Sequence, residues 1–148
     1  MKLLADMDDP RQPDIAQFEL EEWIDSSPFE KLLGLKIESS ADGKAVLSMP
    51  FVVKLANGGG VMHGGAMTSL ADTAVAMAIK SLLPSGTKFA TTGLTMEFLA
   101  PVISGIVYAS AGVKNTGKHS FEGICELRGE DRRIYARFTS VFKVARQK

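Results

Sequence analysis

The 148-residue sequence has one cysteine and no excess charge of either sign. A lone thiol, Cys125, cannot form an internal disulfide. The 17 basic and 17 acidic side chains cancel, so no net charge draws the chain to nucleic acid or to an anionic membrane. Near the start, Asp6, Asp8 and Asp9 stand where a signal peptide needs an apolar core. We therefore expect a cytoplasmic protein that binds neither nucleic acid nor membrane.

Long apolar runs are also missing. The longest, residues 66–83, is interrupted by Asp72 and Lys80 and is shorter than the roughly 20 residues of a bilayer span. We interpret it as a helix buried inside a globular protein. The chain length suits one domain, large enough to bury about two thirds of the surface that its unfolded chain exposes.

The first 26 residues have little regular pattern. Residues 1–15 contain Pro10, Pro13 and several aspartates without an apolar period, which predicts a loose leader. Residues 16–25 hold no helix breaker and predict a short amphipathic helix. We therefore assign 1–26 to a leader with a short helix and 27–148 to the folded domain.

Helix and strand signals become clear after residue 26. Ser27 can cap a helix that begins at Pro28 and has Glu30 at its third position, and Gly34 can end it. Residues 35–51 alternate apolar and polar side chains around an Ala-Asp-Gly turn, which predicts a β-hairpin. Further strands are predicted at 89–99, 105–114, 120–128 and 133–144. Short turns join these strands, so we expect an antiparallel meander of four.

The long helix, residues 65–83, is apolar or small almost all round. Such a helix is buried on every side. A lone antiparallel sheet can bury it only by curling around it. The predicted fold is therefore α+β, with an antiparallel sheet wrapped around one central helix.

A glycine-rich run, residues 57–65, precedes this helix. It matches neither a P-loop nor a dinucleotide fingerprint, because Gly65 is followed by Ala66 and Met67, and His63 stands where the fingerprint needs a third glycine. Glycines can instead expose the first helix amides, which form an anion site for an oxygen that gains charge in acyl transfer. Gly64 is the candidate donor, and Asn57 and His63 could assist it. The alternative is a flexible turn with a core histidine.

Asp72 is the only carboxylate in the apolar helix. Burial costs a carboxylate its hydration, and chemistry is the usual reason to retain one. A structural bond to Arg137 or to a threonine hydroxyl is the alternative. A metal site is not predicted, because His63 and Asp72 have no familiar ligand spacing and His119 lies in a distant turn. We expect no cofactor.

Together, Asn57, the run Val61-Met62-His63-Gly64-Gly65, Asp72 and the segment "TTGLTMEFLAPV" at 91–102 resemble the hotdog-fold acyl-CoA thioesterases, especially the phenylacetate-degradation type. The resemblance covers about residues 27–145. It implies a hotdog fold and hydrolysis of an acyl-CoA to the acid and free CoA. It also implies roles for individual residues: Asp72 as general base or nucleophile, Gly64 as oxyanion donor, Asn57 and His63 as aids at the carbonyl or the water, Thr91 as a hydroxyl that places water, and Lys118 and His119 as contacts for the nucleotide phosphates.

The spacing of Gly64 and Asp72 has a consequence for assembly. Eight residues of helix separate them by about 12 Å, so one carbonyl cannot touch both. A complete site would need Asp72 from a second copy, which predicts an obligate homodimer, perhaps paired into a homotetramer. We expect Ala71, Ala74 and Ala78 to let two antiparallel helices approach closely.

Two rival functions stay open: a hotdog dehydratase acting on a hydroxyacyl thioester, and a noncatalytic acyl-CoA binding protein. No DNA-binding motif accompanies the second. The acyl group is not determined by the sequence. Candidates for its pocket are adaptable side chains, which could equally be plain core: Met49, Met62, Met67, Met77, Met96 and Phe98.

Overall fold

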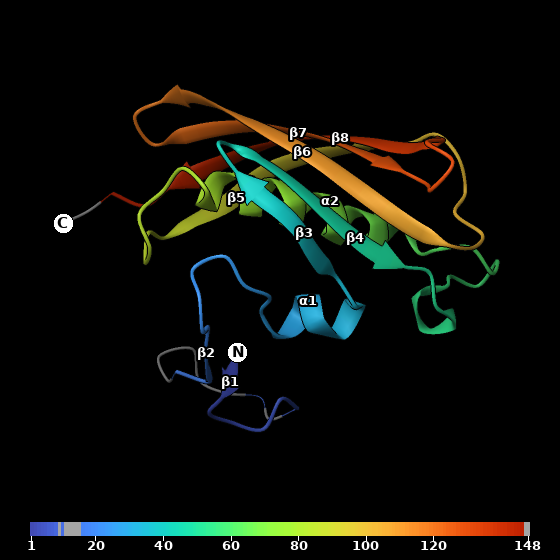
Figure 1. Ribbon diagram of the computed structural model, residues 1–148, viewed down its shortest axis with the longest axis horizontal. Helices are drawn as coiled ribbons and strands as arrows, with labels where there is room; N and C mark the ends of the chain where they lie inside the picture. The colour runs from blue at the N-terminus through green and yellow to red at the C-terminus, as the bar shows by residue number, and fades with distance from the viewer. Residues whose placement is uncertain (9, 11–15, 147–148) are drawn as a thin grey trace.

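The computed structural model describes residues 1–8, 10 and 16–146 of the chain. A six-stranded antiparallel sheet has the strand order β3-β4-β6-β7-β8-β5. It curves around one long helix, α2 (Gly64–Lys80), as Figure 1 shows. The strands are β3 (Lys36–Ala41), β4 (Lys44–Pro50), β5 (Phe89–Phe98), β6 (Ile106–Gly117), β7 (Ser120–Arg128) and β8 (Ile134–Val144). The predicted α+β architecture, a sheet wrapped around a central helix, is confirmed.

The predicted hairpin is β3 and β4. Asp42 and Gly43 form its turn with φ angles of 53° and 76°, the left-handed conformation that a tight hairpin needs. On β4, the alternating residues Ala45, Leu47 and Met49 are buried against the helix side of the sheet. The period-two pattern therefore identified the core face correctly.

The predicted four-strand meander is wrong at its first strand. β6, β7 and β8 pair in sequence, but β5 pairs with β8 at the far edge, and β6 pairs with β4. The link between β5 and β6 is a seven-residue segment containing Pro101 and Gly105 rather than a tight turn. The backbone of this link is hydrogen-bonded to the segment just before α2: the carbonyl of Val102 accepts from the amide of Met62. A connection of that length leaves β5 free to reach the opposite edge.

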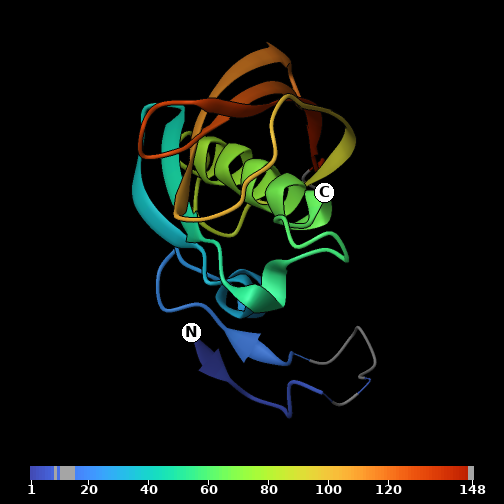
Figure 2. The same ribbon diagram turned by 90° about the vertical axis from the view of Figure 1, so that its right-hand side faces the viewer.

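Helix α2 is buried on the sheet side only, so the expectation of burial on every side is wrong for the single chain. Figure 2, in which the helix runs obliquely, shows the sheet arching over it. A Cβ added to Gly123 of β7 would lie 2.3 Å from Cγ1 of Val75, so this glycine permits close approach of sheet and helix. One stripe of α2 stays partly exposed: Ser69, Asp72, Thr73, Ala76 and Lys80.

The small residues expected to face a second helix lie on the side of α2 that is opposite the exposed stripe. Ala71, Ala74 and Ala78 have no exposed surface and face the sheet. An apolar sequence all round the helix cannot show which face the sheet takes, and this is why the expectation failed. Near the open stripe, the small residues are Gly65, Ser69 and Ala76.

The N-terminal part differs from its prediction. No helix forms over 16–25; instead β2 (Phe18–Glu19) pairs with β1 (Lys2–Leu3). Ala16, Leu20, Trp23 and Ile24 do stand at helical spacing, but Trp23 instead bonds the carbonyl of Lys80 at the end of α2, so contacts with the rest of the protein override the local pattern. The predicted loose leader lies partly outside the described residues, at 9 and 11–15. The boundary at residue 26 stays a prediction.

Helix α1 (Pro28–Leu33) confirms the start and stop signals after residue 26. Ser27 occupies the N-cap position, although its side chain makes no capping hydrogen bond. Gly34 ends the helix with φ 76°, donating its N–H to the carbonyl of Lys31. A 3-10 turn, η1 (Val53–Leu55), leads into the glycine-rich run.

Candidate active site

His63 fixes the start of helix α2. Its Nδ1 accepts a hydrogen bond of 2.8 Å from the amide of Gly65, so the side chain caps the helix. Its own amide donates to the carbonyl of Leu55 at 2.7 Å. Because Nδ1 is the acceptor, the neutral ring carries its proton on Nε2, which can donate to a ligand. A Cβ on Gly65 would lie 2.9 Å from Nδ1, so this cap needs a glycine there.

Gly64 is the first residue of α2, and its N–H has no acceptor among the described residues. The ring of Phe98 lies over it: a Cβ at this position would be 3.1 Å from Cζ of Phe98. Asn57, Met67 and Leu99 join these two residues around a cavity of about 390 Å³. A free helix-terminal amide in a partly apolar cavity is suited to an oxygen that gains negative charge.

Asn57 closes the glycine-rich run into a defined turn. Its Oδ1 accepts hydrogen bonds from the amides of Gly59 at 2.9 Å and Val61 at 3.3 Å. Gly60, with φ 84°, completes the turn by donating its amide to the carbonyl of Asn57. With Oδ1 used in this way, Nδ2 is the group of Asn57 that can donate to a ligand.

Asp72 lies in the middle of α2 and is half-buried. The hydroxyl of Thr91 on β5 donates to its Oδ1 at 2.8 Å. Burial raises the pKa of Asp72 above the usual value for aspartate, and the Thr91 hydrogen bond opposes this with a smaller effect. Asp72 forms no salt bridge with any described residue, and Arg137, the partner considered from the sequence, lies 3.8 Å from Glu126 instead. A carboxylate that stays partly desolvated without an ion pair is typical of a functional site.

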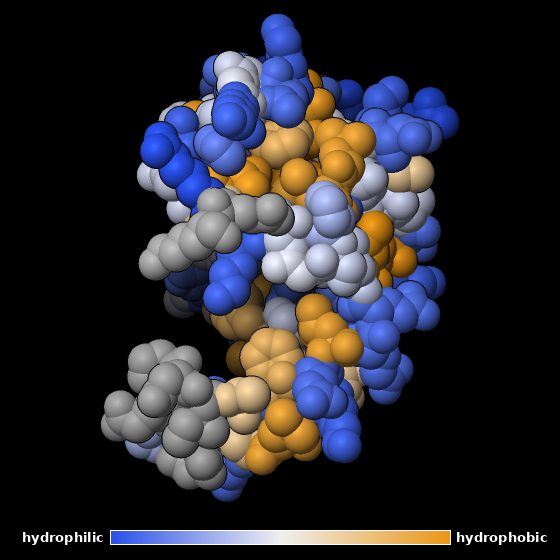
Figure 3. Space-filling view, turned by 90° about the vertical axis from the view of Figure 1, so that its left-hand side faces the viewer, coloured by the Kyte–Doolittle hydropathy of each residue, from blue (hydrophilic) through white to orange (hydrophobic). Residues whose placement is uncertain are grey.

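The cavity beside Asp72 has a volume of about 510 Å³. Figure 3 views the molecule from the side where the N-terminal part and the main body enclose a hollow.

Two groups of residues that line the Asp72 cavity were not predicted from the sequence. Ser69 and Thr73 are hydroxyls beside Asp72 on α2, which helical spacing could have revealed. Aromatic rings come from three regions of the chain, which no local pattern brings together: Trp23, Phe29, Phe89 and Phe142.

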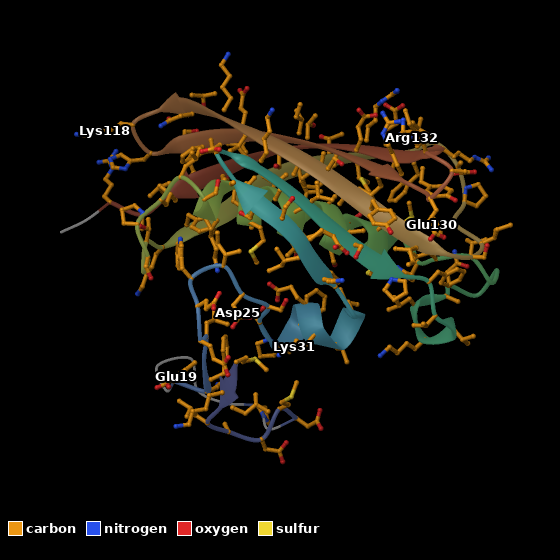
Figure 4. The ribbon with its side chains drawn as sticks, viewed as in Figure 1. Glu19, Asp25, Lys31, Lys118, Glu130 and Arg132 are labelled. Carbon is orange, nitrogen blue, oxygen red and sulfur yellow. The ribbon has the colours of Figure 1, made fainter. Side chains whose placement is uncertain are left out.

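The predicted site residues fall into three groups. Asn57, His63 and Gly64 lie at or just before the start of α2. Asp72, farther along the helix, and Thr91 of β5 line a second cavity, which shares no lining residue with the cavity beside Asn57 and Gly64. Lys118 and His119, in the β6–β7 turn, line a third hollow of about 760 Å³ with Arg146. It adjoins the Asp72 cavity at Thr87, which lines both. Figure 4 shows Lys118 at one end of the sheet and Arg132 at the other.

The described residues contain no group of three His, Cys, Asp or Glu side chains placed to hold a metal ion. No helix within them has the length and apolar character needed to cross a bilayer.

Comparison with known proteins gives consistent results. Residues 59–136 match the model of the thioesterase superfamily. The acyl-coenzyme A thioesterase PaaI of Escherichia coli is 34% identical over 109 residues, which cover 73% of this chain and 76% of that protein.

Solved structures agree. A conserved protein of Pseudomonas aeruginosa superposes with a TM-score of 0.79 at 30% identity, covering 86% of this chain and 100% of its own. The E. coli PaaI protein from the phenylacetic acid degradation operon superposes with a TM-score of 0.75 at 30% identity, covering 82% and 87%. The matched region contains Gly64, Asp72 and Thr91. The chain is therefore a hotdog-fold enzyme that belongs to the thioesterase superfamily.

Proposed function

We propose that this enzyme hydrolyses acyl-CoA thioesters to a free acid and CoA. The observation that carries the proposal is Asp72, a half-buried carboxylate that faces a cavity, accepts a hydrogen bond from the Thr91 hydroxyl and forms no salt bridge with any described residue. The similarity to an acyl-CoA thioesterase of E. coli supports the same substrate class.

The chemistry needs few groups. Water attacks the thioester carbon while Asp72 takes its proton, and the carbonyl oxygen becomes an oxyanion bound by the Gly64 amide. The C–S bond then breaks, and the thiolate of CoA leaves with little acid help, because a thiol has a pKa near 8.5. Alternatively Asp72 attacks first to form an anhydride, which water hydrolyses. Both routes use the ionised carboxylate.

We propose a site shared between two copies. Gly64 and Asp72 open into separate cavities of one chain, so the Asp72 of one copy would act with the Gly64, Asn57 and His63 of the other. The exposed stripe of α2 supports a homodimer, and so does β5, a sheet edge with Leu94 46% exposed. Pairing of two dimers into a homotetramer is part of this proposal.

The remaining roles follow from position. Thr91 would orient Asp72 and the attacking water. Lys118 and His119, beside Arg146, would bind the nucleotide phosphates of CoA, because their hollow adjoins the Asp72 cavity.

We also propose a cytoplasmic location. It suits a chain whose one thiol is buried, where burial and the charge of Glu126 raise the pKa of Cys125 to about 12.

Thiol release tests the function. The purified protein is incubated with acetyl-, hexanoyl-, decanoyl- and phenylacetyl-CoA, and free CoA is followed with a chromogenic thiol reagent. We expect steady release from at least one ester, with Asp72→Ala as the inactive control. Release from none would contradict the proposal and favour a binding protein or a dehydratase. Calorimetric binding of the intact esters and hydration of an enoyl-CoA separate those two.

The Thr91 hydrogen bond predicts a change in pH dependence. Activity rises with pH as Asp72 ionises, and the Thr91 hydroxyl lowers the pKa of this carboxyl. Thr91→Val removes that hydroxyl, so the acid limb of the kcat/KM profile should move to higher pH. Thr92→Val is the matched control, because that hydroxyl bonds the carbonyl of Val141 instead, at 3.2 Å. A limb that stays in place or moves to lower pH would argue against Asp72 as the titrating group.

A further inference from the structure

Trp23 is joined to the end of helix α2 by two reciprocal hydrogen bonds. Its indole Nε1 donates to the carbonyl of Lys80 at 2.9 Å, and the Lys80 Nζ donates to the carbonyl of Trp23 at 2.9 Å. The ammonium also lies 4.6 Å from the centre of the indole ring, within range of a cation–π interaction. We call these three contacts the Trp23–Lys80 clamp. The clamp ties the N-terminal part to the helix that carries Asp72.

The clamp has a second side, which faces the Asp72 cavity. Trp23 and Lys80 both line it, together with Phe29 of α1. Across the cavity, Phe89 and Phe142 form a tilted pair with ring centres 6.0 Å apart. Ala76, one helical turn after Asp72, leaves room between the two walls. The cavity thus runs from the carboxylate into a space bounded by aromatic rings.

The Lys80 ammonium of the clamp is partly buried and donates to the Trp23 carbonyl. Burial lowers the pKa of Lys80, and the nearby carboxylates of Glu30 and Asp25 oppose this with smaller effects. Glu30 and Lys88 also line the cavity, so the rings form one apolar wall in a lining that is otherwise partly charged. An apolar group of the ligand gains most from contact with that wall.

We propose that Trp23 is a specificity-determining residue, which together with Phe29 forms the outer wall of the acyl pocket and sets the acyl size that the enzyme accepts. This inference rests on the proposed hydrolysis of acyl-CoA. Trp23 and Phe29 lie before residue 59, where the match to the family model begins. The acyl range would therefore be set by a segment outside the matched region.

A kinetic comparison tests the wall. Trp23→Ala and Phe29→Ala should each lower kcat/KM for decanoyl- or phenylacetyl-CoA by about tenfold or more, while acetyl-CoA changes little, because it does not reach the rings. Trp23→Phe keeps a ring and should lose less. Phe18→Ala is the matched control: it removes an N-terminal ring that lines a neighbouring hollow, shared with Phe29, but does not line the Asp72 cavity. Equal losses for all esters would overturn the acyl assignment and indicate contact with CoA, and no loss for any ester would also overturn it.

Fluorescence gives a readout that does not depend on turnover. Trp23 is the only tryptophan of the chain, so its emission reports on this wall alone. In Asp72→Asn, S-decyl-CoA, a thioether that cannot be hydrolysed, should change the emission in a saturable way, whereas free CoA should leave it nearly unchanged. The same change with free CoA, or none although calorimetry shows that the thioether binds, would overturn the inference. If the wild type hydrolyses no ester, the proposed function fails separately from this result.

Discussion

Asp72→Asn is expected to lower kcat by about a thousandfold, the usual size of the contribution of a positioned base. Asparagine has nearly the same shape and can still accept the Thr91 hydroxyl. It can neither take a proton from water nor form an anhydride. Steady-state kinetics on the best ester of the panel measures the loss. Asp42→Asn is the matched control, because this exposed aspartate lies in the β3–β4 turn, at a positive φ that asparagine tolerates.

The same variant should be more stable than the wild type at neutral pH. Burial raises the pKa of Asp72 in the folded state, so ionisation of this carboxyl costs folding free energy above that pKa. The cost grows as pH rises from the unfolded to the folded pKa and is absent below both. Urea unfolding should therefore show the stability gain at neutral pH and its loss in acid.

In the kinetic test, activity of Asp72→Asn within about tenfold of wild type would refute the role of Asp72 in catalysis.

Two inactive variants, Asn57→Ala and Asp72→Ala, are expected to restore activity when their subunits are mixed. In a shared site, the hybrid dimer contains one complete set of groups: the Asp72 of the first variant and the Asn57 of the second. Random exchange makes half of the dimers hybrids with one working site of two. The mixture should therefore reach about a quarter of wild-type activity.

The mixture is prepared by joint unfolding and refolding of the two variants, and activity is compared with each variant refolded alone. Two differently tagged preparations of Asp72→Ala, refolded together, give the control for the procedure. Activity of the mixture no higher than the mean of its two components would show that each chain carries its own complete site.

The sequence was enough to predict most local elements after residue 26, because their signals are local, whereas the helix expected over 16–25 does not form. The Asp42–Gly43 turn and the end of α1 at Gly34 need positive φ angles, which few residue types adopt, so these residue types predict them. The position of β5 was not predictable in this way, because a seven-residue link does not decide which edge a strand joins. The sequence also does not show that Ala71, Ala74 and Ala78 face the sheet, because this depends on which side of α2 the sheet covers.

The candidate site shows the same division. Asp72 stands out in the sequence because an isolated carboxylate in an apolar helix is costly. Its partner could not be chosen there between Arg137 and a hydroxyl, since both choices depend on strand register. Trp23 had no sequence signal at all, because its partner lies 57 residues away.

The glycine-rich run before α2 contains two kinds of glycine. A side chain at Gly58 would meet nothing within 4 Å, and one at Gly59 would meet only the Asn57 Oδ1 at 3.4 Å. At Gly64 and Gly65 the Phe98 ring and the His63 imidazole already occupy that space. Evolutionary drift can therefore replace the first two at little cost, while the last two can change only if their aromatic neighbours change with them.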